Sequence, residues 1–421
     1  MDAPSGWNFP GALRLGELEE EAAVEAVREV MRSKRLFRYY GLTPNPLQRS
    51  RVRRLEKEFV SLTGAKEALA LNSGTSALVS ALAGFGVGGG GGVIVPAYTW
   101  FSTATAVLAV GAVPVIAEVD ESLTLDPEDF RAKLSPHTAA AIPVHMRGAP
   151  AEMDELTRVA SENGVRLLED VAQAAGASFR GRRLGSLGDA GAFSFQMAKL
   201  ITSGEGGMLT SSDSDVVRRA RMYHDAGVGR QGDISAGEWL PGFSLRMSEL
   251  HAAVLLVQLE RLDGVLDAMR RRKRALKERL QGEFDARGIR FRTINDTDGE
   301  AGLALVFFLP DTQHIESVVS GLADENVPAS RLFHGLKNVP RDSVDMHVYW
   351  AWPPLIQKRT WSARGGPWAG HPREVDYPEE TCPRTRDLLE RAVHVDIRPD
   401  LEEQHVDQLA GAITDAIRRC A

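Results

Sequence analysis

Between residues 68 and 210 the chain alternates short runs of apolar, often β-branched residues with stretches of helical periodicity. The apolar runs, interpreted as strands, are residues 68–71, 93–95, 113–117, 139–144, 166–169, 190–195 and 207–210. The helical stretches between most of them include residues 75–82, 103–109, 127–133 and 153–163. This alternation predicts a doubly wound α/β domain on a mostly parallel sheet. In such sheets ligands collect at the carboxyl ends of the strands, so we expect the chemistry in the loops that follow them.

The pattern changes near residue 246. Apolar residues then repeat at steps of three and four from Leu250 to Met269, which predicts a long amphipathic helix leading out of the large domain. The elements predicted after it are one strand and two helices: residues 303–308, 315–326 and 403–418. We therefore predict a large α/β domain at residues 1–255 and a smaller α+β domain at residues 256–421, although the N-terminal segment could pack with the small domain.

Composition and charge narrow the class of protein. The 421 residues are 43% hydrophobic, and no apolar run approaches the roughly 20 residues needed to cross a bilayer. A formal net charge of -7 disfavours nucleic acid as a partner, and we interpret the basic run at residues 270–274 as a solvated helix face. The N-terminus has no secretion signal, and two cysteines, Cys382 and Cys420, cannot build a disulfide framework. We expect a cytoplasmic protein.

Two of the predicted strands are followed by residues suited to bind an aromatic anion. Gly74, Thr75 and Ser76 open a predicted helix, where backbone N–H groups and hydroxyls can hold an anionic group. Ordinary helix capping by Ser and Thr is the alternative. Trp100 leaves the next strand and could lie against a bound ring, although a buried structural tryptophan would give the same pattern.

Two later strands are followed by ionisable residues. Glu169 and Asp170 come directly after a buried run, either as helix caps or as a carboxylate that keeps a ring nitrogen protonated. Ser194 and then Lys199 follow the next strand, in apolar and glycine-rich surroundings. Burial lowers the pKa of an amine and makes it a nucleophile that can form an imine, whereas a surface lysine is the alternative.

Taken together, these segments resemble the DegT/StrS sugar aminotransferases, a family of fold-type-I enzymes that depend on pyridoxal phosphate. The segments that carry the resemblance extend over nearly the whole chain and agree in order and spacing. They include NSGTSAL, PAYTWFSTA, GAVPVIAEVD, EDVAQAAGASF, KLITSGEGG, RMSELHAA and CPRTRDLLERAV. The resemblance implies a large domain with a mostly parallel seven-stranded sheet and a smaller C-terminal α+β domain.

The resemblance also implies roles for individual residues in holding pyridoxal phosphate. Lys199 would hold the cofactor as a Schiff base and then move the proton, and Asp170 would pair with the ring nitrogen. Trp100 would lie against the ring, and Gln173 would reach its hydroxyl. The phosphate would be held by Gly74, Thr75, Ser76 and Ser194.

The implied reaction moves an amino group from an amino acid, Glu or Gln, to a ketone. The acceptor would be a keto-sugar, a nucleotide-linked keto-sugar, a keto-cyclitol or a related intermediate of secondary metabolism such as antibiotic biosynthesis. Members of the family form homodimers that share active sites, so we expect a homodimer with no nucleic acid or membrane partner. Ser244 stands where the family commonly has an Asn that reaches the partner's phosphate site.

The acceptor is left open by the sequence. Arg147 departs from the usual family motif at His145–Gly148 and could recognise an anionic acceptor, with a surface arginine as the alternative. The other candidates for contact with the acceptor are Tyr39, Tyr40, His334 and His347. The spacing of the histidines is not that of metal ligands, so we expect no metal.

Two other functions are compatible with parts of the pattern. Sugar dehydratases related to this family keep the cofactor but replace its lysine with His, and Lys199 argues against that reaction. A non-catalytic regulatory relative would not need the lysine, the aspartate and the phosphate loop together.

Overall fold

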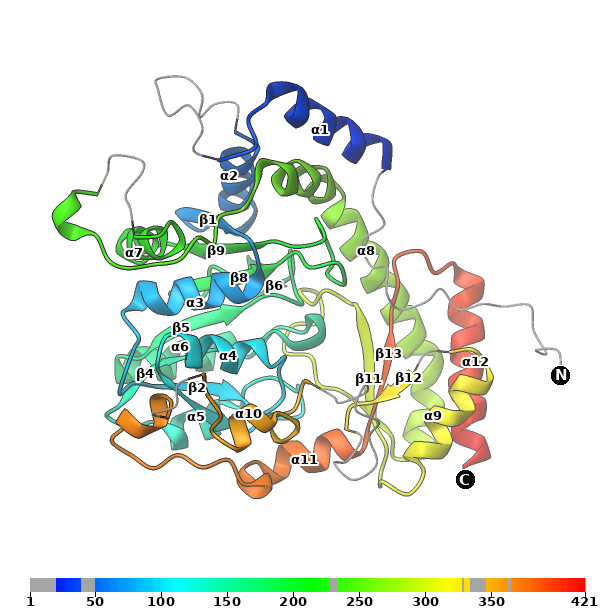
Figure 1. Cartoon of the computed structure of the whole chain (residues 1–421). Helices are drawn as coiled ribbons and strands as arrows, with labels where there is room; N and C mark the ends of the chain where they lie inside the picture. The colour runs from blue at the N-terminus through cyan, green and yellow to red at the C-terminus, as the bar shows by residue number, and fades with distance from the viewer. Residues whose placement is uncertain are drawn as a thin grey trace.

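The computed structural model describes residues 20–38, 50–227, 234–327, 329–333, 346–361 and 365–420. Figure 1 shows a large sheet with helices on its faces and a smaller sheet beside it, next to the C-terminal helices. A long helix, α8 (Glu249–Ala286), runs past both.

The large sheet has seven strands, and its topology confirms the predicted mostly parallel α/β fold. The strands are β1 (Glu67–Leu71), β2 (Gly92–Pro96), β3 (Val113–Ala117), β4 (Thr138–Ala141), β5 (Arg166–Asp170), β8 (Ala190–Ser194) and β9 (Gly207–Ser211). Their order is β1-β9-β8-β5-β4-β2-β3, and β9 runs antiparallel to both of its neighbours while the other pairs are parallel. The run predicted as a strand to residue 144 is a regular strand only to Ala141. Val144 then pairs with Asp170 of β5 in an isolated parallel bridge, before a short 3-10 helix at Met146–Gly148.

Helices cover this sheet, and several begin at the residues that the sequence favours as caps. The helices before α8 are α1 (Glu20–Ser33), α2 (Arg51–Thr63), α3 (Gly74–Phe85), α4 (Ser102–Ala109), α5 (Pro127–Lys133), α6 (Met153–Asn163) and α7 (Ser214–His224). Among them, α1 packs on α8. Ser73 caps α3, and Asp126 caps α5 with a proline in its first turn. The first residue of α3 therefore lies directly after β1, at the edge of the sheet where the other parallel strands end.

The small domain is built on a four-stranded antiparallel sheet. Its strands are β10 (Arg290–Phe291), β11 (Ala304–Phe308), β12 (Ala329–Arg331) and β13 (Ala392–Asp396), in the order β10-β11-β13-β12. The helices α9 (Ile315–Asp324) and α12 (Glu403–Arg419) pack together, and α12 also packs on α8. A boundary at residue 255 falls inside α8, so that division of the chain stays a prediction.

The remaining elements are short. They are the hairpin β6 (Ser178–Phe179) and β7 (Arg182–Arg183), and the helices α10 (Pro353–Ile356) and α11 (Pro383–Glu390). Within the described ranges, no helix is long and apolar enough to cross a membrane.

The basic run at residues 270–274 differs from the solvated face expected from the sequence. Arg270 donates to the backbone carbonyls of Gly299 and Glu300, and Arg272 donates to that of Leu401. Lys273 is buried and paired with Glu300. The interpretation was wrong for these three residues because the small domain covers that side of α8; only their neighbours Arg271 and Arg274 are exposed.

Candidate active site

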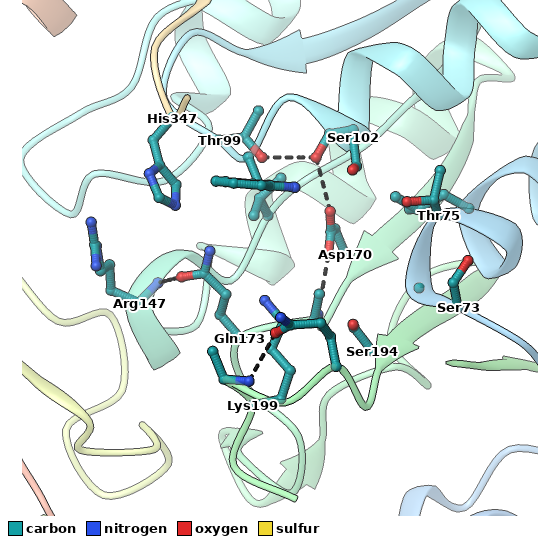
Figure 2. A pocket seen from close by; sticks show the side chains of 18 of the residues that line it. Ser73, Thr75, Thr99, Ser102, Arg147, Asp170, Gln173, Ser194, Lys199 and His347 are labelled. Carbon is teal, nitrogen blue, oxygen red and sulfur yellow. Dashed lines mark hydrogen bonds between the residues drawn. The ribbon is translucent and has the colours of Figure 1, made fainter. Parts of the chain in front are cut away.

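A cavity of about 530 Å³ lies at the carboxyl ends of the parallel strands. It is lined by residues from both domains, including Ser73, Gly74, Thr75, Thr99, Trp100, Thr103, Arg147, Asp170, Gln173, Ser194, Lys199, Glu205, Leu303, His347 and Asp396. Figure 2 shows Asp170 between two ends of this cavity, with Ser73, Thr75 and Ser194 on one side and Arg147 and His347 on the other. The position is the one expected for ligands of such a sheet.

The two acids at the end of β5 point in opposite directions, as successive residues of a strand do. Asp170 lines the cavity, and its carboxylate accepts from the Thr103 hydroxyl at 2.9 Å and from the Ala172 N–H at 3.1 Å. The Thr103 hydroxyl is in turn 2.8 Å from that of Thr99. Burial raises the pKa of Asp170, against these hydrogen bonds and the charge of Lys199. A cation in the cavity would stabilise the ionised carboxylate.

Glu169 serves the structure on the other face of β5. Its carboxylate accepts from the N–H groups of Gly185, Leu187 and Gly188 at 2.6–2.8 Å. The fourth contact is with the buried His145, whose Nε2 lies 3.1 Å away and whose Nδ1 accepts from the Ala151 N–H. All these groups are satisfied inside the fold, so Asp170 is left as the acid that faces the cavity.

Lys199 lies in the turn after β8 and lines the same cavity. The backbone N–H of Lys199 donates to the backbone carbonyl of Gln196 at 2.9 Å, and this hydrogen bond closes the turn. Burial lowers the pKa of the Lys199 amine, Asp170 opposes that shift, and the positive charge of Arg147 adds to it. A lowered pKa leaves more of the amine unprotonated and nucleophilic, which is unlike the surface lysine of the alternative interpretation.

One end of the cavity is an anion cradle at the start of α3. Ser73 caps this helix and lines the cavity with Gly74, Thr75 and Ser194. A Cβ on Gly74 would lie 2.6 Å from the Cβ of Ser194, so the close approach of these two segments requires glycine. The Ser76 hydroxyl instead donates to Asn72 Oδ1 at 2.7 Å. Ser73 is among the residues that line the cavity, and Ser76, which was also predicted to hold the phosphate, is not.

The opposite end of the cavity is organised around Arg147. Its backbone has a φ of 55°, and its N–H donates to Gln173 Oε1 at 2.9 Å. Its Nε donates to the Tyr98 hydroxyl at 3.1 Å, and its Nη1 lies 3.5 Å from Nε2 of His394. Strained left-handed backbone at a non-glycine residue is typical of functional sites. Arg147 is therefore part of the cavity rather than a surface arginine.

The tryptophan-rich segment after residue 345 completes this end. The N–H groups of Thr99 and Phe101 donate to the carbonyls of His347 and Met346 at 2.7 and 3.0 Å. The His347 ring then meets the Trp100 ring edge-on, with 5.1 Å between centroids. Trp100 lines the cavity and is 37% exposed, so the buried structural tryptophan considered from the sequence is wrong here.

Some residues expected at the site lie elsewhere. Ser244 is exposed and lies outside the cavity of its own chain, next to Phe243. Tyr39, Tyr40 and His334 lie outside the described residues. Ser73, Thr103 and Asp396 line the cavity, and Tyr98 and His394 contact Arg147, but none of these five was predicted as a site residue. Thr103 could have been found as a polar residue at the start of the predicted helix that follows Trp100. Asp396 comes from a strand of the other domain and gives no local signal.

The described residues hold no group of three or more His, Cys, Asp and Glu side chains that could bind a metal ion. The cavity offers instead an amine with a lowered pKa, a buried carboxylate for a cationic ring and a cradle for an anion.

Comparison with known proteins gives consistent matches. Residues 18–347 match the model of the DegT/DnrJ/EryC1/StrS aminotransferase family. The chain is 31% identical over 383 residues to the spore coat polysaccharide biosynthesis protein SpsC of Bacillus subtilis (strain 168). This match covers 87% of this chain and 90% of that protein. It is 38% identical over 274 residues to the L-glutamine:2-deoxy-scyllo-inosose aminotransferase of Streptoalloteichus tenebrarius, covering 62% of this chain and 63% of that protein.

The solved structures agree with the sequence matches. The crystal structure of 3-amino-5-hydroxybenzoic acid (AHBA) synthase superposes with a TM-score of 0.78 at 30% identity. The match covers 97% of this chain and all of that chain.

Proposed function

The chain belongs to the DegT/DnrJ/EryC1/StrS aminotransferase family and is an aminotransferase, and we propose that it binds pyridoxal phosphate in this cavity and aminates the ketone of a hydroxylated ring. The observation that carries the proposal is that Lys199 and Asp170 face one cavity whose far end is the anion cradle of α3. An aldehyde-bearing aromatic cation with a phosphate matches these three groups.

The residues present fit that cofactor. Asp170 is buried and has a raised pKa, so a protonated ring nitrogen would stabilise its charge. Gly74, Thr75 and Ser194 would hold the phosphate together with Ser73, at the positive end of the α3 dipole. Trp100 would lie against the ring. Gln173, which already holds the Arg147 backbone, would reach the ring hydroxyl.

Once bound, pyridoxal phosphate supplies an electron sink for negative charge at the amino-bearing carbon. Lys199 then holds or moves the proton at that carbon, because its amine lies in the same cavity and has a lowered pKa. Asp170 would hold the ring by its charge, and the Thr103 hydroxyl and the Ala172 N–H fix the position of the Asp170 carboxylate. The amino donor would be Glu or Gln.

The acceptor would be a keto-cyclitol, a keto-sugar, a nucleotide-linked keto-sugar or a related intermediate of secondary metabolism. The names of the relatives support this range, because they include a 2-deoxy-scyllo-inosose aminotransferase and a polysaccharide biosynthesis protein. Arg147 and His347 lie at the end of the cavity away from the phosphate cradle, where the acceptor would be bound.

The test is an absorbance experiment with the full chain. Added cofactor is expected to give the visible band of the lysine-bound form in the native protein and none in Lys199→Ala. Glutamine or glutamate should then convert this band to that of the aminated cofactor. If native protein gives no band, the cofactor proposal is wrong; if neither donor converts the band, transamination is wrong and the dehydratase alternative returns. No cofactor binding at all would favour a non-catalytic relative.

We propose that the chain acts as a homodimer. The segment around Phe243 places large apolar side chains in solvent, with Phe243 itself 60% exposed and Trp239 and Leu240 also exposed. Ser244 lies in this segment and would reach the phosphate site of the partner subunit. Phe243→Asp is expected to shift the sedimentation coefficient from that of a dimer to that of a monomer; a native monomer would contradict the proposal.

We also propose a cytoplasmic location, since both cysteines are free thiols.

A further inference from the structure

Two polar residues of the small domain reach the cavity from the end of β13. His394 and Asp396 are two positions apart on this strand, so their side chains lie on the same face. Asp396 lines the cavity, and its side chain is 23% exposed. His394 is buried behind it. A carboxylate is therefore present at the end of the cavity where Arg147 lies.

The contacts of His394 join these groups into one cluster. Its Nε2 lies 3.3 Å from Asp396 Oδ1 and 3.5 Å from Arg147 Nη1. Its Nδ1 lies 3.4 Å from the Ser330 hydroxyl. His394, Asp396 and Arg147 thus come from two domains and meet at one point, which fixes the distance between the carboxylate and the guanidinium.

The imidazole in this cluster is neutral. Burial lowers the pKa of His394 well below its usual value, and the positive charges of Arg147 and Arg292 and the nearby His347 and Lys273 act in the same direction. The Nε2 of His394 lies 3.3 Å from Asp396 Oδ1, so the buried ring packs against that carboxylate and limits where it can lie. His394 is then a positioning residue for Asp396.

We propose that Asp396 is a specificity-determining residue that accepts a hydrogen bond from a hydroxyl of the amino acceptor. Arg147 donates to the same hydroxyl or to a neighbouring one. This inference rests on the proposed aminotransferase function. A hydroxyl both donates and accepts, a guanidinium only donates and a carboxylate only accepts, so the pair matches a polyhydroxylated ring. An acceptor with an anionic group at this point would be repelled by Asp396. This refines the sequence-based hypothesis that Arg147 recognises an anion.

The discrimination follows from the cost of leaving buried polar groups without partners. A site built to bind a hydroxyl rejects the analogue that lacks it, because the carboxylate and the guanidinium then lose their hydrogen bonds. A ring that lacks the hydroxyl should therefore bind more weakly to the native protein, and this penalty should shrink when Asp396 is neutral.

The experiment measures the two half-reactions separately in the cofactor-loaded enzyme. The acceptor probes are 2-deoxy-scyllo-inosose, its further monodeoxy analogues and an anionic keto acid, and the donor is glutamine. Asp396→Asn should raise the KM for 2-deoxy-scyllo-inosose about tenfold or more, as expected for losing a charge-assisted hydrogen bond, with the glutamine half-reaction unchanged. One monodeoxy analogue should bind worse than the parent to native enzyme and equally to Asp396→Asn.

Two further variants separate recognition from folding. Asp400→Asn removes a carboxylate that pairs with Arg398 outside the cavity and should leave both half-reactions unchanged. His394→Phe should raise the acceptor KM with little change in kcat, and His394→Gln, which keeps an N–H donor, should restore it. If Asp396→Asn does not fold, Asp396→Glu and the two His394 variants carry the same test.

The outcomes separate this inference from the function it rests on. Native enzyme that neither glutamine nor glutamate can load overturns the proposed function itself. Enzyme that loads with glutamine but aminates the keto acid and none of the hydroxylated ketones, or aminates neither, overturns the role of Asp396. An unchanged acceptor KM in Asp396→Asn, or equal losses in both half-reactions, also overturns it.

Discussion

The two ends of the cavity are built in different ways. The end with Ser73, Gly74 and Ser194 is formed by the chain that follows β1, the first turn of α3 and the end of β8, all within the large domain. The opposite end joins Arg147, His347 and Asp396, which come from a strained turn, a tryptophan-rich segment and the small domain. The first end suits the phosphate, which is the same group in every enzyme that uses this cofactor. The residues of the second end can differ between relatives without a change in the large sheet.

The largest expected effect is at Lys199, because its amine lies in the cavity that the two ends share. Lys199→Ala removes the nucleophile and the group that moves the proton, so turnover should fall by at least about a thousandfold. The measurement is the rate at which the native chain and the variant aminate a panel of keto-sugars and keto-cyclitols with glutamine or glutamate. Met197→Ala, an exposed neighbour in the same turn, serves as the control for the fold of the turn. Turnover within tenfold of native in Lys199→Ala would contradict the account.

Glu169 stabilises the sheet under the cavity through its hydrogen bonds to the backbone of residues 185–188. Glu169→Gln places an amide NH₂ against N–H donors that now bind a carboxylate, so the free energy of unfolding should fall by about 3 kcal/mol. Asp170→Asn should have the opposite sign in protein without cofactor, because burial raises the Asp170 pKa and so disfavours its charged form in the folded state. Chemical denaturation of both variants at neutral pH checks the contrast, and equal destabilisation would refute it.

The anion cradle can be disturbed by a single methyl group. Gly74→Ala would press its Cβ against Ser194, so cofactor affinity should fall about tenfold or more while the KM for the acceptor changes little. Gly89→Ala is the matched control, because its Cβ would enter open space. Titration of cofactor absorbance measures the affinity. A larger effect on the acceptor than on the cofactor would show that the two ends are not separate.

The smallest expected effect is electrostatic, because the charge of Arg147 at one end of the cavity changes the pKa of Lys199. Arg147 helps to lower the pKa of Lys199, so Arg147→Gln should raise that pKa. The amine then loses its proton at higher pH, and the rate at which added cofactor combines with the protein should rise at higher pH than in the native chain. Arg391→Gln, whose guanidinium pairs with Asp387, is the control. A shift toward lower pH would contradict the sign of this interaction.

The sequence predicted the large sheet well because its strands are short apolar runs, and α3 and α5 begin after capping residues. α5 and α6 were predicted with the bounds that the structure has, whereas α1, α2 and α7 were missed. α1 and α2 lie before the alternating region, and α7 follows the last predicted strand. The regular strand β4 ends at Ala141, but the predicted run still pairs with β5 at Val144, so its apolar residues indicated the extent of pairing better than that of the strand itself.

The site was predictable to the extent that it follows strand ends. Lys199, Asp170 and Thr75 each come just after a strand or at the start of a helix, where local pattern and chemistry coincide. The choice between Glu169 and Asp170, and between Ser73 and Ser76, depends on which way each side chain points, and that is set by tertiary contacts. His394 and Asp396 lie some two hundred residues from Lys199 along the chain, so only the fold brings them together.

The most direct test of the central claim measures both half-reactions in Arg147→Ala and Gly74→Ala. We expect Arg147→Ala to keep its cofactor affinity and its glutamine half-reaction and to lose acceptor binding. Gly74→Ala should lose cofactor affinity and keep its acceptor KM once saturated with cofactor. Equal losses in both half-reactions for either variant would contradict a cavity with one end for the cofactor phosphate and another for the acceptor.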